Sequence, residues 1–153
     1  MLKEYTLIGR LLDLAKDEIE YRYIRTGLRN VNWSLSLWTL DPGFFLACGS
    51  GISSAKRFMN KLASFLRTIG IPLTVVVYPW PDQIFHADTD SRQVQIWREW
   101  STQVGSDFIN LFPIFFNQGT PRGAIEKLYL RDDVHFSEIG HRLVADTLEE
   151  LWR

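Results

Sequence analysis

Leu73-Thr74-Val75-Val76-Val77-Tyr78 is the stretch of sequence that decides the fold. It is apolar almost throughout and rich in β-branched side chains, which is typical of a strand covered on both faces. Upstream of it, apolar residues recur at helical spacing from Ser53 or Ser54 to Thr68, and Gly70 stands where a helix C-terminal cap is expected. A helix, a glycine and a buried strand form half of a βαβ unit.

The sequence after this strand continues the alternation of helices and strands. A helix is predicted from about Ser91 to Val104, and residues 108–112 predict a second short strand that Pro113 ends. A polar loop is expected around residues 117–123, and Ser137 is expected to cap a last helix. The apolar stripe of that helix is predicted to be buried and consists of Ile139, Leu143, Val144, Leu148, Leu151 and Trp152. The pattern indicates an α/β fold with a short parallel sheet between helices.

Residues 1–54 are predicted to be a divergent N-terminal helix and linker. Apolar residues recur at helical spacing from Thr6 to about Arg25, and apolar residues between positions 33 and 40 hint at an extended segment. Asp41-Pro42-Gly43 indicates a turn before a short apolar run at 44–47. We expect one domain over residues 1–153, because a chain of this length fits a single core.

Composition narrows the classes of partner. Lysine and arginine (17) nearly balance aspartate and glutamate (18), so no overall field predicts binding to nucleic acid or to an anionic membrane. The single cysteine, Cys48, excludes an internal disulfide framework and fits a reducing compartment. No secretory signal is recognisable at the start, and the apolar stretches are interrupted too early for a membrane span. We expect a soluble, cytoplasmic protein whose partner is small and neutral.

The segment that is most informative for function is residues 132–141, Asp-Asp-Val-His-Phe-Ser-Glu-Ile-Gly-His. They place two carboxylates, Asp132 and Asp133, just before His135 at the start of the last helix. The positive end of the helix dipole disfavours the protonated imidazole, whereas an adjacent carboxylate fixes its tautomer and stabilises the imidazolium that forms during acyl transfer. The pattern predicts a general base. The alternative is a loop histidine that only bonds to a capping aspartate.

The order of elements in this sequence resembles the C-terminal half of SGNH (GDSL-type) hydrolases. The order is a strand ending in Tyr78-Pro79-Trp80-Pro81, a helix, the second strand, and the Asp-His block with its Gly-His helix. The resemblance covers about residues 55–153. It implies a three-layer α/β/α domain of the flavodoxin-like type, truncated here at its N-terminal side. In that family the aspartate usually lies three residues before the histidine, as Asp132 does, and in a subset closer to carbohydrate O-acetyltransferases it lies two residues before, as Asp133 does.

The resemblance also implies an activity. A Ser-His-Asp mechanism would hydrolyse an ester bond or transfer an O-acyl group, with His135 as the base and a small ester or an acylated carbohydrate as the substrate. Such chemistry needs no cofactor and no metal. The family's Gly-Asp-Ser nucleophile block is missing from this sequence, and so are recognisable glycine and asparagine donors of an oxyanion hole. We therefore expect little or no turnover from this chain alone.

A second hypothesis belongs to a different class. Two recognisable strands make a poor sheet, so the chain could be a non-catalytic remnant or interaction module that pairs its incomplete sheet with another polypeptide or with itself. Ser50, between two glycines, is the serine best suited to a tight nucleophile turn, or else part of a glycine-rich helix start. Trp80 is a candidate wall of an acyl or sugar pocket, or else a packing residue. A metal site joining His135 and His141 is not expected, since this spacing does not put two imidazoles on one helical face.

Overall fold

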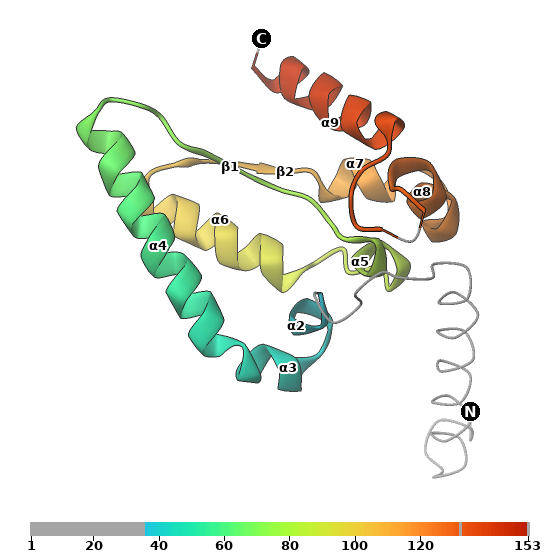
Figure 1. Cartoon of the computed structure of the whole chain (residues 1–153), viewed down its shortest axis with the longest axis horizontal. Coiled ribbons are helices and arrows are strands. Elements are labelled where there is room, and N and C mark those ends of the chain that lie inside the picture. The colour runs from blue at the N-terminus through green and yellow to red at the C-terminus, as the bar shows by residue number, and fades with distance from the viewer. Residues whose placement is uncertain (1–35, 132, 153) are drawn as a thin grey trace.

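The structure is a computed structural model that describes residues 36–131 and 133–152. Two strands and a larger set of helices follow one another along this part of the chain (Figure 1). Their order is α2 (Leu37–Leu40), α3 (Pro42–Ala47), α4 (Gly49–Thr68), β1 (Thr74–Val77), α5 (Pro81–Phe85), α6 (Arg92–Val104), β2 (Asp107–Asn110), α7 (Phe112–Phe116), α8 (Pro121–Leu128) and α9 (Glu138–Leu151). The helix predicted from Thr6 to about Arg25 lies outside the described residues.

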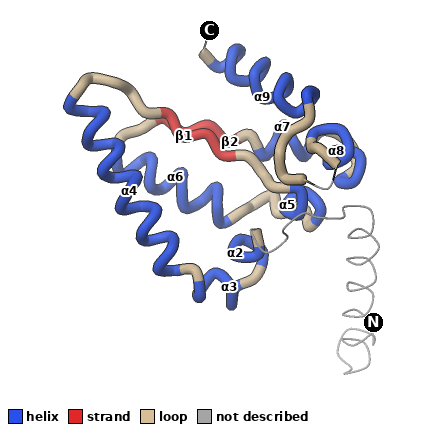
Figure 2. Tube along the Cα trace, viewed as in Figure 1, coloured by secondary structure: helices blue, strands red, loops and turns tan. Residues whose placement is uncertain are grey.

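The two strands form a parallel pair, as the sequence predicts. Thr74 is opposite Asp107 and Val77 is opposite Asn110. Most of the rest of the described chain is helical (Figure 2). The structure is therefore compatible with an α/β fold, while the three-layer flavodoxin-like arrangement stays a prediction, because the described residues supply a sheet of only two strands.

Several predicted elements are confirmed, and local signals explain them. Ser91 caps α6 by accepting a hydrogen bond from the backbone N–H of Gln93. Gly105 ends the same helix in the left-handed conformation, with φ of +70°, and Gly70 adopts φ of +70° just after α4. β1 forms where predicted but is less covered than predicted, since Val77 is its only buried residue.

The extended interpretation of the segment before α4 is wrong over the residues that the structure describes. Residues 37–40 form helix α2, and residues 42–47, predicted as a turn and an apolar run, form helix α3. Asp41 Oδ1 accepts hydrogen bonds from the backbone N–H groups of Gly43 and Phe44, and Pro42 occupies the first helical position. An aspartate followed by a proline is a turn signal and also a helix N-terminus signal, and here the helix forms. Helix α4 also begins earlier than predicted, at Gly49.

The second half of the chain holds two further corrections. The second strand ends at Asn110, whose side chain accepts a hydrogen bond from the backbone N–H of Phe112, the first residue of helix α7. The predicted polar loop contains the start of helix α8, which Thr120 caps by accepting a hydrogen bond from the N–H of Gly123. None of the described helices is both long enough and apolar enough to cross a membrane.

Helix α9 packs against the main core with one part of its predicted stripe. Leu143 and Val144 contact the core cluster around Phe115, whereas three stripe residues are exposed, contrary to the prediction: Ile139, Leu151 and Trp152. The first turn of α9 lies so close to the end of α8 that a Cβ atom on Gly140 would be 2.1 Å from the carbonyl oxygen of Leu128. Only glycine fits there, and this contact fixes where α9 begins.

Candidate active site

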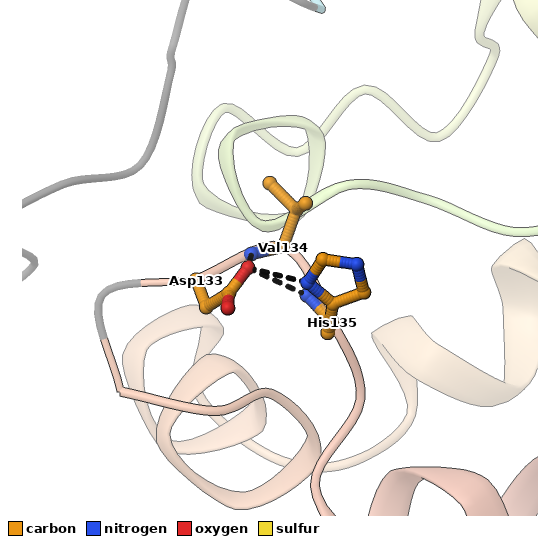
Figure 3. A network of polar contacts seen from close by, with 3 residues as sticks. All are labelled: Asp133, Val134 and His135. Carbon is orange, nitrogen blue, oxygen red and sulfur yellow. Dashed lines mark hydrogen bonds and ion pairs between the residues drawn. The ribbon is translucent and has the colours of Figure 1, made fainter.

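His135 and Asp133 form a hydrogen-bonded pair on the surface. His135 Nδ1 lies 2.7 Å from Asp133 Oδ1, and the histidine side chain is 76% exposed (Figure 3). The same carboxylate oxygen accepts hydrogen bonds from the backbone N–H groups of Val134, at 2.6 Å, and of His135, at 3.3 Å. Because Asp133 Oδ1 accepts from its neighbours, the neutral imidazole takes the tautomer that carries its proton on Nδ1.

This tautomer leaves the lone pair of His135 Nε2 available. The hydrogen bond from His135, followed by those from the backbone, lowers the pKa of Asp133, so the carboxylate is ionised at neutral pH. Figure 3 shows Nε2 on the side of the ring away from Asp133. No hydrogen bond to Nε2 occurs within the described part of the chain. The pair can therefore accept a proton at Nε2 while Asp133 stabilises the resulting imidazolium.

Backbone hydrogen bonds hold the loop that carries His135. The N–H of Leu130 donates to the carbonyl of His135 at 2.9 Å, and the N–H of Asp133 donates to the carbonyl of Leu130 at 3.1 Å. Tyr129 and Phe136 form an antiparallel bridge that closes the loop. The structure thus brings Asp133 to His135, and Asp132, the other predicted orienting residue, lies outside the described residues.

Aromatic contacts place this loop beside the carboxyl end of β1. The ring of Phe136 lies 4.8 Å from that of Tyr78, which directly follows β1, and 5.4 Å from that of Tyr129. The hydroxyl of Tyr129 donates a hydrogen bond to the carbonyl of Pro79. Burial raises the pKa of Tyr129, so this hydroxyl keeps its proton. Functional residues of parallel sheets gather at the carboxyl ends of the strands, and the loop of His135 lies beside such an end.

Ser137 caps helix α9, as predicted. Its hydroxyl accepts a hydrogen bond from the N–H of Gly140 at 3.1 Å and donates to the carbonyl of Lys127 at 2.6 Å. Its own N–H donates to the carbonyl of Leu128 at 2.8 Å. His135 therefore lies two residues before Ser137, the cap residue of α9, which is hydrogen-bonded to the end of α8.

The other candidates from the sequence are not joined to His135. Trp80 is half-buried at the start of α5, and its backbone N–H donates to Gln83 Oε1 at 2.8 Å. Ser50 is exposed in the first turn of α4. Among the described residues, no serine hydroxyl is hydrogen-bonded to His135. The same residues contain no group of three or more histidine, cysteine, aspartate or glutamate side chains that could hold a metal ion.

Sequence reasoning missed Asp82, a buried carboxyl group just after β1. Its exposed fraction is 2%, and its Oδ1 has no hydrogen-bond partner within the described residues. Burial raises the pKa of this carboxyl to about 7. The next residue, Gln83, is fully buried and donates hydrogen bonds to the side chains of Thr39, Asp88 and Ser91. The sequence gives no local signal for this burial, because Tyr78-Pro79-Trp80-Pro81 stands between β1 and Asp82.

Comparisons of the chain with protein families, with curated proteins and with solved structures find no match. The features that bear on function are therefore the geometry of His135 and Asp133 and the position of this pair beside the end of β1. The two side chains form a hydrogen-bonded histidine–carboxylate pair on a small α/β framework.

Proposed function

We propose that this chain carries the acid–base part of a serine-type site of the SGNH kind, which hydrolyses an ester bond or transfers an O-acyl group. His135 acts as the base and Asp133 orients it. The observation that supports this most strongly is the 2.7 Å contact at Nδ1 combined with an exposed ring whose Nε2 is unengaged within the described residues.

On this proposal His135 and Asp133 serve both halves of an acyl transfer. His135 Nε2 takes the proton of a serine hydroxyl while the serine oxygen attacks the ester carbonyl, and the imidazolium is stabilised by Asp133. The same proton then passes to the departing alcohol as the carbon–oxygen bond breaks, leaving an acyl-serine. Water, or the hydroxyl of an acceptor sugar, then attacks this acyl group while His135 Nε2 takes its proton. The acyl–serine bond breaks, the proton passes from His135 to the serine oxygen, and the acid or the new ester is released. The described serines do not reach His135, so the proposal requires that another segment or chain supply the nucleophile.

The substrate that we propose is a small ester or an acylated carbohydrate. Tyr78 is partly exposed beside the ring of Phe136, and Trp80 follows two residues later, so aromatic surface suited to an acyl chain or a sugar ring lies near the end of β1. We further propose a cytoplasmic location, with which the free thiol of Cys48 agrees.

Ester hydrolysis by the purified chain tests the proposal. The rate with p-nitrophenyl acetate is compared between the wild-type chain and His135→Ala, with His141→Ala as a control that removes the other imidazole of the same segment. We expect a slow rate that disappears in His135→Ala and persists in His141→Ala. A rate that survives in His135→Ala would refute the assignment of the base.

A second measurement does not depend on the nucleophile. Nitrogen-15 spectra of the imidazole report which ring nitrogen carries the proton. We expect Nε2 of neutral His135 to be unprotonated in the wild-type chain, and we expect Asp133→Asn to abolish this preference. An Nε2-protonated ring in the wild-type chain would contradict the proposed role.

A second candidate function is favoured by the outer edge of β1. The N–H of Asp107 donates to the carbonyl of Leu73, and that of Leu111 donates to the carbonyl of Val77, so alternate residues of β1 face β2. The backbone groups of Val76 then face away from β2, where an added strand would pair. On this proposal the chain is an interaction module. Sedimentation that showed a monomer at every concentration, without dye-binding apolar surface, would contradict it.

A further inference from the structure

Helix α4 leaves a continuous apolar stripe in solvent. Phe58, Leu62 and Phe65 recur at helical spacing, and Ile69 extends the same line at the C-cap. Phe58 and Phe65 are each 60% exposed, and Ile69 is 51% exposed. From Phe58 to Ile69 the stripe is about 17 Å long at the usual rise of an α-helix.

The opposite side of α4 attaches the helix to the rest of the protein. Asn60 Oδ1 accepts a hydrogen bond from Trp100 Nε1 at 2.7 Å, and Arg67 donates to the carbonyl of Val104 at 2.7 Å. Both partners belong to α6. Helix α6 therefore contacts the side of α4 that carries Asn60 and Arg67, and among the described residues the apolar stripe stays exposed.

The charges on α4 all have one sign. The helix contains no aspartate or glutamate, and its basic residues are Lys56, Arg57, Lys61 and Arg67. Arg57 and Lys61 border the stripe, because their charged groups lie 5.2 and 5.6 Å from the ring centre of Phe58. A shallow groove of about 580 Å³ runs beside them and is lined by Ser53, Lys56, Arg57, Asn60, Lys61 and Ser64. Cations and exposed rings thus share one surface.

We propose that α4 binds the surface of an anionic lipid bilayer. The helix would lie in the plane of the interface, with the rings of Phe58 and Phe65 at the boundary of the acyl chains and the charged groups of Arg57 and Lys61 on the phosphates and carboxylates of the headgroups. A bilayer offers an apolar layer and a negative layer along the whole length of the helix, and the stripe and the cations of α4 match both. The net charge of −1 conceals this surface, because acids elsewhere in the chain offset the cations of α4.

Co-sedimentation with vesicles tests this proposal. The full chain is mixed with vesicles of phosphatidylcholine alone or of phosphatidylcholine with phosphatidylserine. We expect binding to the anionic vesicles that weakens as salt is added, and little binding to the neutral ones. Arg57→Gln combined with Lys61→Gln should weaken binding about thirtyfold, since each basic residue near such a surface contributes roughly a factor of five. Arg98→Gln combined with Arg142→Gln removes the same charge elsewhere and should leave binding almost unchanged.

A second pair of variants tests the apolar part. Phe58→Ser combined with Phe65→Ser should abolish binding, while Leu151→Ser, which removes an exposed side chain from α9, should not. Circular dichroism of each variant checks that its helices are kept. The proposal is overturned if anionic vesicles bind no better than neutral ones, or if the charge variant and its control lose binding equally. It is also overturned if the wild-type chain self-associates in sedimentation without binding vesicles and the Phe58/Phe65 variant becomes monomeric, since a second copy would then cover the stripe.

Discussion

Replacing Gly140 by alanine is expected to destabilise the protein and to disturb the histidine loop. The added Cβ would lie 2.1 Å from the carbonyl oxygen and 3.0 Å from the carbonyl carbon of Leu128, and 3.1 Å from Cβ of Phe136. Backbone atoms cannot rotate away as a flexible side chain can. Helix α9 must therefore move away from α8 by about 1 Å to restore an ordinary contact.

The magnitude follows from two opposing effects. Forcing a methyl group into a packed contact costs about 1–3 kcal/mol, and more when backbone must shift. The shift also lengthens the hydrogen bond between the N–H of Ser137 and the carbonyl of Leu128, which is 2.8 Å in the native structure. Alanine gains roughly 1 kcal/mol over glycine inside a helix. We expect a net loss of about 2 kcal/mol in the free energy of unfolding, measured by urea denaturation at constant m value.

Gly51→Ala is the matched control, because Gly51 also lies inside a helix and an added Cβ there meets no atom within 4 Å. It should leave the free energy of unfolding unchanged or raise it by up to about 1 kcal/mol. If Gly140→Ala is as stable as Gly51→Ala, the close approach of α9 to α8 does not exist in solution and the reasoning about the position of His135 fails with it.

Two further substitutions test buried groups near the site. Asp82 has a folded-state pKa of about 7, above its unfolded value. The folded state therefore holds a proton that the unfolded state releases, and stability should fall as pH rises through the acidic range to about 7. The total loss in the free energy of unfolding is about 4 kcal/mol at most. Asp82→Asn should abolish this pH dependence, measured by urea titrations at several pH values. If the variant and the wild-type chain show the same change of stability with pH, Asp82 is ionised in the folded state. Tyr129→Phe removes the hydroxyl that bonds the carbonyl of Pro79 and should cost about 1–3 kcal/mol, measured by thermal or urea unfolding. A neutral result would mean that water reaches this carbonyl.

Local signals in the sequence account for the elements that were predicted well. Ser91 and Ser137 sit where a side-chain oxygen can cap a helix, and the apolar run of β1 can only be a strand or a buried helix. Such features depend on neighbours within a few residues, which the sequence displays directly.

The short helices were missed because their start signals are also turn signals. Asp41-Pro42 and Thr120-Pro121 each begin a helix here. Whether a turn or a helix forms at such a pair depends on what the next residues pack against. The burial of Asp82 likewise arises from tertiary packing that no local pattern encodes. Spacing alone left Asp132 and Asp133 equivalent. The fold of the loop, closed by the bond between Leu130 and His135, is what places the carboxylate of Asp133 on the imidazole.

The hydroxyl of Tyr129 links two loops that belong to different parts of the sequence. It holds the carbonyl of Pro79, while the backbone of Tyr129 is bridged to Phe136, the neighbour of His135. Anything that displaces the chain after β1 must pull on this tyrosine and thereby move the imidazole. Occupation of the strand end by a ligand or by another polypeptide would thus be transmitted to the loop of His135, and the chemical shifts of the His135 ring would report it.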